Sequence, residues 1–158
     1  MQRRFFFSAF VLLGIACATS FVPSTNSSAE LTRYVDAAAR LVQTEGVAAC
    51  GAFHEPTWKA GEYYVFVTSA ETNVTVCHPV RDELVGQDQT DLQDANGKFF
   101  IREMLAVASS PAGKGWVDYV WPRPGETTPA QKAAYVVSVA GPDGKRYVVG
   151  SGAYGVVH

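Results

Sequence analysis

The stretch between residues 113 and 139 concentrates large aromatic side chains, with a lysine among them, in and around a predicted hairpin. These residues are Trp116, Tyr119, Trp121, Lys132 and Tyr135. Such side chains can fill the core of a sheet. They can also line a pocket in which polar tips and one ammonium group hold a small anion between apolar walls that exclude water. The residue types alone leave both possibilities open.

The spacing of these residues limits which of them can meet. Tyr119 and Trp121 are two positions apart, so they share one face of a strand. Lys132 and Tyr135 are three positions apart, so they point to opposite faces unless the strand starts after Lys132 or carries a bulge. His78 is a further candidate, because a neutral imidazole N–H suits an anion near neutral pH. Its other reading is a hydrogen-bonding residue of a turn.

Catalytic and metal-binding patterns are missing from the sequence. It has three histidines, but no serine elbow and no cysteine, histidine and acid arrangement. Asp88, Asp91 and Asp94 recur at every third position, whereas a calcium-binding EF-hand loop needs alternate ligands and a final glutamate. We interpret these aspartates as turn and cap residues. We therefore expect no catalytic site, metal site or cofactor.

The first twenty residues have the form of an export signal. Arg3 and Arg4 precede an apolar run that is too short for a membrane span and is followed by small residues. The paired arginines also resemble a twin-arginine signal, and Cys17 gives a weaker indication of a lipid anchor. We expect a periplasmic or secreted protein. The net charge of -2 argues against a nucleic-acid partner.

Export would also change how the cysteines are interpreted. Once Cys17 is removed with the signal, Cys50 and Cys77 are the only pair left in the chain. In an oxidising compartment such a pair is a candidate disulfide. The alternative is two small buried apolar side chains, and the sequence does not decide between them.

Periodicity predicts one α+β domain, at residues 30–158, after the export signal at residues 1–20 and a polar tether at residues 21–29. An amphipathic helix is expected over residues 30–45 and a second, inserted helix over residues 98–108. Strands are expected at residues 63–67, 74–79, 115–121, 132–140 and 146–157. The predicted architecture is a long N-terminal helix packed on a five- to six-stranded antiparallel sheet with an inserted helical segment.

Several short motifs carry a resemblance to a known family. They are His78-Pro79, Leu84-Val85-Gly86, the run from Asp94 to Lys98, the run from Gly115 to Tyr119 with Trp121 and Pro124, and Gly152-Ala153-Tyr154. From residue 30 to the C-terminus the chain resembles the single Cache domain of the second type, a PAS-like extracellular sensor fold. The resemblance implies a pocket for small organic acids such as acetate, propionate or pyruvate. The ligand-binding residues predicted on this basis are His78, Tyr119, Trp121, Lys132, Tyr135, Phe66 and Tyr154.

The resemblance also implies a function without catalysis. Cache domains usually form the input of chemoreceptors and sensor kinases, whereas this chain looks like a free-standing exported member. We therefore expect a sensory module that binds a small organic acid and acts through a separate membrane receptor or sensor kinase. The alternative is a structural or interaction module with a degenerate pocket, whose long helix forms a homodimer or docks a membrane partner.

Overall fold

The computed structural model describes residues 20–158, so Cys17 and all but the last residue of the predicted export signal lie outside the described part. The helices are α1 (Ser28–Glu45), α2 (Cys50–Phe53) and α3 (Phe100–Ala108), with 3-10 turns at Gly46–Ala49 and Asp82–Leu84. The strands are β1 (Phe66–Ser69), β2 (Thr75–Cys77), β3 (Lys114–Pro122), β4 (Pro129–Ala140) and β5 (Arg146–Tyr154).

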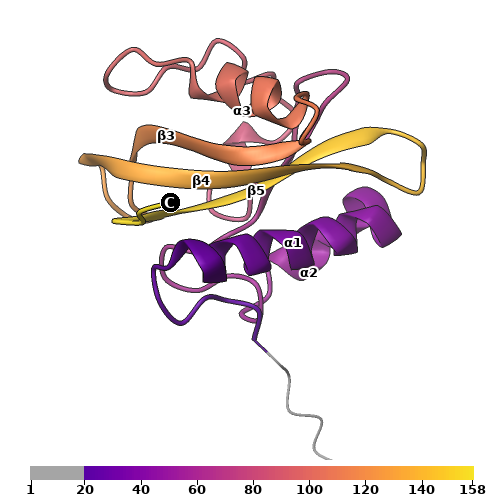
Figure 1. Cartoon of the computed structure of the whole chain (residues 1–158), viewed down its shortest axis with the longest axis horizontal. Helices are drawn as coiled ribbons and strands as arrows, with labels where there is room; N and C mark the ends of the chain where they lie inside the picture. Colours follow the sequence, from indigo (N-terminus) through magenta and orange to yellow (C-terminus); the bar gives the residue numbers. More distant parts are fainter. Residues whose placement is uncertain (1–19) are drawn as a thin grey trace, which may run out of the picture.

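The strands form one five-stranded antiparallel sheet in the order β2-β1-β5-β4-β3. Helices α1 and α2 cover one face of this sheet, and α3 with its flanking loops covers the other (Figure 1). The molecule is therefore a three-layer α+β sandwich, which confirms the predicted fold class. Both faces of the sheet are buried, so alternate residues of each strand enter two different interiors.

Helix α1 begins and ends where local chemistry permits it. The hydroxyl of Ser27 accepts a hydrogen bond from the backbone N–H of Glu30 at 3.2 Å and caps the first turn. Gly46 ends the helix with a φ of 62°, a conformation that costs glycine little. The apolar stripe of α1, from Leu31 to Val42, packs against β4 and β5.

Asp94 was expected as a helix cap and has a different task. Helix α3 starts at Phe100 without a side-chain cap. The Oδ1 atom of Asp94 instead accepts from the backbone N–H groups of Asn96 and Lys98, each at 2.9 Å, and Oδ2 accepts from Val120 N at 3.0 Å. Asp94 thus closes the turn before α3 and ties that turn to β3.

Some strand limits differ from the expected ones because backbone groups find other partners. The expected strand 63–67 starts only at Phe66, since Tyr63 forms an isolated bridge with Ala60 in a tight turn. The last strand ends at Tyr154, whose carbonyl accepts a hydrogen bond from the Asn26 side chain at 2.9 Å. The second strand has only three residues.

The segment expected to be a polar tether lies against the domain. Phe21 stacks on Trp58 with ring centroids 4.3 Å apart, and its backbone N–H donates to Thr57 O at 2.9 Å. The carboxylate of Glu30 accepts from the backbone N–H groups of Ser24 and Thr25 at 2.8 and 2.9 Å. These contacts set the entry angle of α1.

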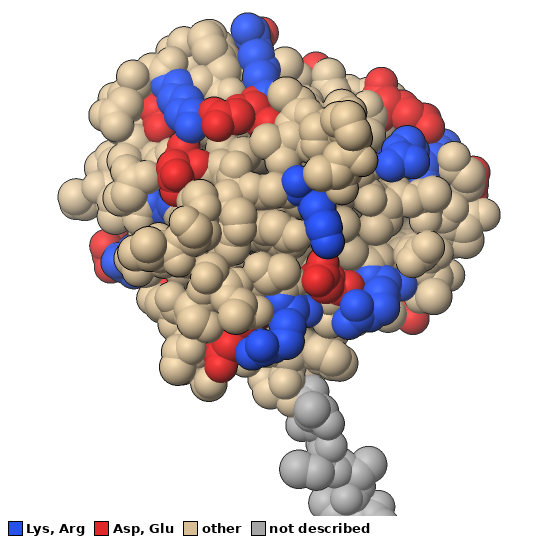
Figure 2. All heavy atoms as spheres, in the orientation of Figure 1, with Lys and Arg blue, Asp and Glu red and all other residues tan. Residues whose placement is uncertain are grey.

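The surface gives no sign of one dominant charge. Figure 2 shows acidic and basic side chains interspersed over the visible face. Within residues 20–158, no helix combines the length and the apolar character that crossing a bilayer requires.

Candidate ligand-binding site

Strand register decides which of the predicted site residues can meet. Tyr119 of β3 pairs with Lys132 of β4, and Lys132 pairs with Tyr154 of β5. Directly paired residues share a face, so these three lie in one row on the α3 side of the sheet. Trp116 pairs with Tyr135 in the same ladder, on the opposite face.

Tyr135 is therefore not brought to the other candidates. Its ring packs against Trp116, with centroids 5.1 Å apart, in the core beneath α1. The pairing of β4 with β3 and β5 runs without a bulge from residue 132 to residue 135. Lys132 and Tyr135 belong to one regular strand, so their three-residue spacing places them on opposite faces of the sheet.

A small cavity of ≈ 40 Å³ lies on the α3 side of the sheet. Four predicted site residues line it: Phe66, His78, Tyr119 and Trp121. The rest of its lining is formed by Tyr64, Thr68, Thr75, Leu84, Gln89, Leu92, Phe100, Ile101 and Met104. About 10–15 Å³ measured in this way holds one water molecule, so the cavity has room for only a few heavy atoms.

Aromatic rings form one wall of this cavity. Phe100 of α3 stacks on Tyr119 with a centroid distance of 4.5 Å and an interplanar angle of 6°, and Trp121 lies 5.4 Å from Phe100. Burial raises the pKa of Tyr119 well above its ordinary value, so its hydroxyl stays protonated. The wall excludes water and offers a phenolic O–H as a hydrogen-bond donor.

His78 supplies an N–H donor at the cavity. Its Nδ1 accepts a hydrogen bond from the backbone N–H of Arg81 at 3.0 Å, which leaves the imidazole proton on Nε2. Burial, assisted by the nearby charge of Lys132, lowers the pKa of His78 to about 4. The ring is thus neutral at pH 7 and presents one donor.

Lys132 lies behind the wall rather than in it. The side chain is fully buried, and Nζ donates to the hydroxyl of Tyr64 at 2.9 Å while lying 4.4 Å from the centroid of that ring. Burial lowers the pKa of Lys132 to about 7, against the opposing effect of the Glu62 charge. Lys132 does not line the cavity but donates to Tyr64, which does, so its charge reaches the cavity through the Tyr64 hydroxyl.

Tyr154 also belongs to the layer behind the cavity. Its hydroxyl donates to the carbonyl of Pro122 at 2.7 Å, and its ring lies 5.3 Å from Lys132 Nζ. The Arg123 guanidinium covers the ring at 4.2 Å. Tyr154 thus supports Lys132 and does not line the cavity.

Sequence reasoning missed several polar residues of the lining. Tyr64, Phe66 and Thr68 are successive alternate positions, so period-two alternation puts them on one face, but it does not say which face of the sheet that is. Thr75 and Gln89 enter the cavity from β2 and from the loop before α3, where no periodic pattern points to them.

The structure brings the two cysteines together. Cys50 opens α2 and Cys77 ends β2, and both carry free thiols. The Cys50 thiol donates to the carbonyl of Val76 at 3.6 Å, and the interaction between the two neighbouring thiols lowers the pKa of Cys50 and raises that of Cys77. The expected disulfide stays a prediction, and it would form next to His78.

The aspartates of the loop before α3 have local partners. Asp88 accepts from Thr90 N at 2.8 Å, and Asp91 forms an ion pair with Arg102. Over residues 20–158 the structure contains no group of three or more acidic, histidine or cysteine side chains arranged to hold a metal ion.

Comparisons with known proteins agree with the fold. The family model of the single Cache domain 2 matches residues 30–155. The methyl-accepting chemotaxis protein McpP of Pseudomonas putida is 34% identical over 79 residues, which are 50% of this chain and 14% of that protein. The sensor histidine kinase MctS of Rhizobium johnstonii is 35% identical over 91 residues, 58% of this chain and 18% of that protein. The chain thus spans less than a fifth of the length of these relatives.

Solved structures show the same similarity. A periplasmic sensor domain of a chemotaxis protein aligns with a TM-score of 0.68 at 33% identity, over 80% of this chain and 94% of that one. A Cache chemosensory domain described for its carboxylic acid recognition aligns with a TM-score of 0.68 at 26% identity, over 81% and 92% of the two chains. The chain belongs to the single Cache domain 2 family.

Proposed function

We propose that this protein is an exported sensory module that binds a small organic acid in the cavity beneath α3. The observation that carries the proposal is a buried donor set beside a buried lysine that has no ion-pair partner among the described residues. His78 Nε2–H and the hydroxyls of Tyr64 and Tyr119 border the cavity, with Lys132 behind Tyr64. Within the described residues, no carboxylate forms an ion pair with Lys132 within 4.0 Å.

The polar and apolar parts of the cavity suit a short carboxylate. Its carboxyl group would accept hydrogen bonds from His78 and Tyr64, and the positive charge of Lys132 would act across the ring of Tyr64. Its one- or two-carbon tail would lie against Phe66, Phe100 and Met104. A volume of ≈ 40 Å³ favours acids such as acetate, propionate and pyruvate over longer ones.

Water has little access to the site, because the side chains that would bind the anion are buried. Tyr64, Tyr119 and His78 are exposed by 3%, 5% and 7%. In so dry an environment each charge-assisted hydrogen bond is stronger than at the surface. An apolar ligand would leave these buried donors unpaired, so the site discriminates against it.

The signalling output is proposed from the relatives. McpP is a chemotaxis protein and MctS is a sensor kinase, and the matched region is a small part of each. We propose that this domain passes its signal to a protein of one of these kinds, in the periplasm or outside the cell. Dimerisation through α1 stays a prediction.

A thermal-shift screen against acetate, propionate, pyruvate, lactate and a set of amino acids tests the proposal. At a hundred times its Kd, a ligand specific for the folded state should stabilise the fold by about 2.7 kcal/mol. We expect one or two short monocarboxylates to raise Tm and alkylamines of equal size to leave it unchanged. If no acid raises Tm at millimolar concentration, the pocket does not bind this class and the interaction-module alternative gains support.

A further inference from the structure

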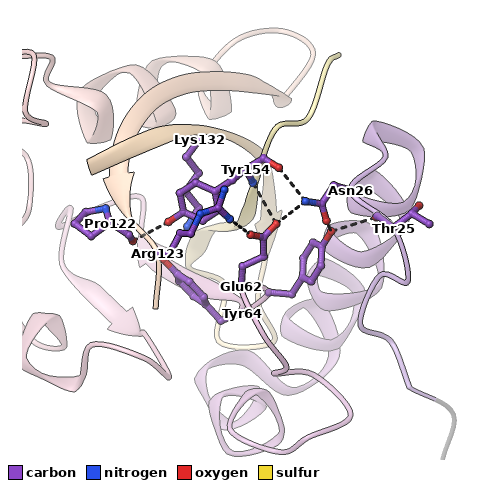
Figure 3. Close-up of polar contacts among 9 residues, drawn as sticks. Thr25, Asn26, Glu62, Tyr64, Pro122, Arg123, Lys132 and Tyr154 are labelled. Atoms are coloured by element: carbon purple, nitrogen blue, oxygen red, sulfur yellow. Dashed lines mark hydrogen bonds and ion pairs between the residues drawn. The ribbon is translucent and has the colours of Figure 1, made fainter. Parts of the chain in front are cut away.

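Glu62 connects three parts of the molecule that are far apart in sequence. Its Oε1 accepts from Asn26 Nδ2 at 2.8 Å and from Tyr154 N at 3.3 Å, and its Oε2 pairs with Arg123 Nη1 at 2.5 Å (Figure 3). Its side chain is only 16% exposed. One carboxylate therefore joins the segment before α1, the end of β5 and the loop after β3.

Glu62 also acts electrostatically on Lys132 without touching it. Lys132 donates to Tyr64 and forms no ion pair with a described carboxylate, so its ammonium group keeps unused N–H donors. A buried ammonium loses its proton easily unless a negative charge lies nearby. Glu62 accepts from the backbone N–H of Tyr154, the residue that pairs with Lys132 across β4 and β5. From this position its charge favours the protonated form of Lys132 without forming an ion pair, so those donors stay free.

The other groups around Lys132 offer no equivalent negative charge. The titratable side chains next to Lys132 are Tyr64, Tyr119 and Tyr154, and its charge also acts on His78, which follows β2. Two arginines lie one layer further out: Arg123, in the loop after β3, covers the ring of Tyr154, and Arg81, before the 3-10 turn, covers the ring of Trp121. The tyrosines are held neutral by burial, which raises the pKa of Tyr64, Tyr119 and Tyr154. His78 is neutral at pH 7, and the two arginines are positive.

The residues next to Glu62 extend the connection in both directions. Tyr63 donates its hydroxyl to Thr25 O at 3.1 Å and also contacts Asn26 Oδ1. Tyr64 carries the Lys132 hydrogen bond and lines the cavity. Three consecutive residues thus reach the segment before α1 at one end and the ligand cavity at the other.

We propose that Glu62 is a positioning residue that favours the charged form of Lys132 without contacting it and, through Asn26, links the charge at the cavity to the docking of the segment before α1. This rests on the proposed function, because it describes the regulation of the same site. A bound carboxylate would compete with Glu62 for the positive charge of Lys132. Anion binding and docking of residues 20–27 therefore oppose each other, and by linkage each weakens the other equally.

The first experiment follows the charge of Lys132 directly and needs no ligand. The Cε resonance of Lys132 is titrated with pH by NMR in the wild type, in Glu62→Gln and in Glu45→Gln. Glu45 is an exposed residue at the end of α1, so its variant controls for net charge. We expect the Lys132 midpoint to move by about 0.5 to 1 pH unit to lower pH in Glu62→Gln and to stay in place in Glu45→Gln. An unchanged midpoint in Glu62→Gln overturns the proposal.

The second experiment keeps Glu62 intact and removes the cation. Hydrogen exchange is measured at the amides of Tyr154, which donates to Glu62, and Phe21, which donates to Thr57. In Lys132→Met we expect both amides to exchange about fivefold faster, as they would after neutralisation by an anion. Tyr119→Phe removes a hydroxyl from the same row but no charge, and should leave both rates unchanged.

Equal exchange in Lys132→Met and the wild type overturns the linkage, whatever the outcome of the titration. A protein that shows both effects but binds no acid in the thermal-shift screen overturns the proposed function and leaves the role of Glu62 in place. The two ideas therefore fail separately.

Discussion

The two faces of the sheet are built from alternate residues of the same strands, yet they differ in kind. The face beneath α1 is a filled apolar cluster that includes Val35, Phe53, Trp58 and Val149. The face beneath α3 contains the cavity and two buried ionisable groups, His78 and Lys132. The first is mainly apolar, although it also buries the Ser151 hydroxyl without a hydrogen-bond partner. The second buries ionisable groups, a cost that proteins tolerate where function requires it.

Glycines of β5 show how the α3 face makes room for its site. A Cβ at Gly150 would lie 2.4 Å from Phe66 Cζ, and a Cβ at Gly152 would lie 2.8 Å from Lys132 Cε. Both glycines lie on the side of β5 that faces α3, where Phe66 and Lys132 cross the strand closely. On the other side of β5, Val149 fills the core beneath α1. With the proposed site on the α3 side, stability and binding would depend on different faces of one sheet.

The largest expected effect separates the faces by stability. Phe53 is fully buried beneath α1 and packs edge-on against Trp58 at 5.2 Å. Phe53→Ala should lower the free energy of unfolding by about 3–5 kcal/mol, because it leaves a cavity in a dry core. Urea denaturation measures the loss, and calorimetry on the folded fraction should find unchanged acid affinity. A parallel loss of affinity would mean that the two faces are not independent.

The next effect concerns the charge on the α3 face. Lys132→Met keeps most of the side-chain volume and removes the cation behind Tyr64. Loss of a buried charge partner should weaken binding of the best acid by about 2–4 kcal/mol, measured by calorimetry. Circular dichroism should show a folded protein. Binding at wild-type strength would show that Lys132 has only a structural part in this face.

The pH dependence of the free energy of unfolding should reflect the titration of Lys132. The pKa of Lys132 in the fold is about 7, below its ordinary value, so between pH 7 and 9 the unfolded chain holds a proton that the folded one has released. The free energy of unfolding should therefore rise with pH, by up to about 2 kcal/mol over this range. Lys132→Met should abolish the rise.

Other groups set the limits of that window. His78, with a pKa of about 4, adds a rise between pH 4 and 6.5 by the same reasoning. Above pH 9 the buried tyrosines, including Tyr34 and Tyr64, lower the free energy of unfolding. Their raised pKa values make the folded chain keep protons that the unfolded chain loses. Denaturant titrations at fixed ionic strength measure the profile. A flat profile from pH 7 to 9 in the wild type would contradict the lowered pKa of the buried Lys132.

The smallest expected effect concerns one hydroxyl. Tyr119→Phe removes a single donor from the aromatic wall and leaves the stack on Phe100 intact. Acid affinity should fall by about 1 kcal/mol, with little change in unfolding. If this variant alone unfolds the protein, the aromatic group around Tyr119 is a structural core like that beneath α1.

Much of the fold was accessible from local patterns. The stripe from Leu31 to Val42 predicted α1, and dense β-branched and aromatic runs predicted the strands. Strand ends were less accessible, because they depend on distant partners such as the Asn26 side chain on Tyr154 O. The role of Asp94 was missed for the same reason: its contact with Val120 joins residues far apart in sequence.

The site was predictable only in part. Period-two alternation placed Tyr119 and Trp121 together, but it could not say which face of the sheet would carry the cavity. Tyr135 was included although its spacing from Lys132 favoured the opposite face, where the structure places it. The depth of Lys132 behind Tyr64 depends on Gly152, whose missing side chain no strand pattern marks as functional.

A crystal structure of the protein with the acid that gives the largest thermal shift tests the central claim most directly. Our account predicts its carboxylate on the α3 side of the sheet, within hydrogen-bonding distance of His78 Nε2 and the Tyr64 hydroxyl, with its tail against Phe100. An acid bound elsewhere on the molecule, or a cavity that stays without ligand at saturating acid, would contradict the account.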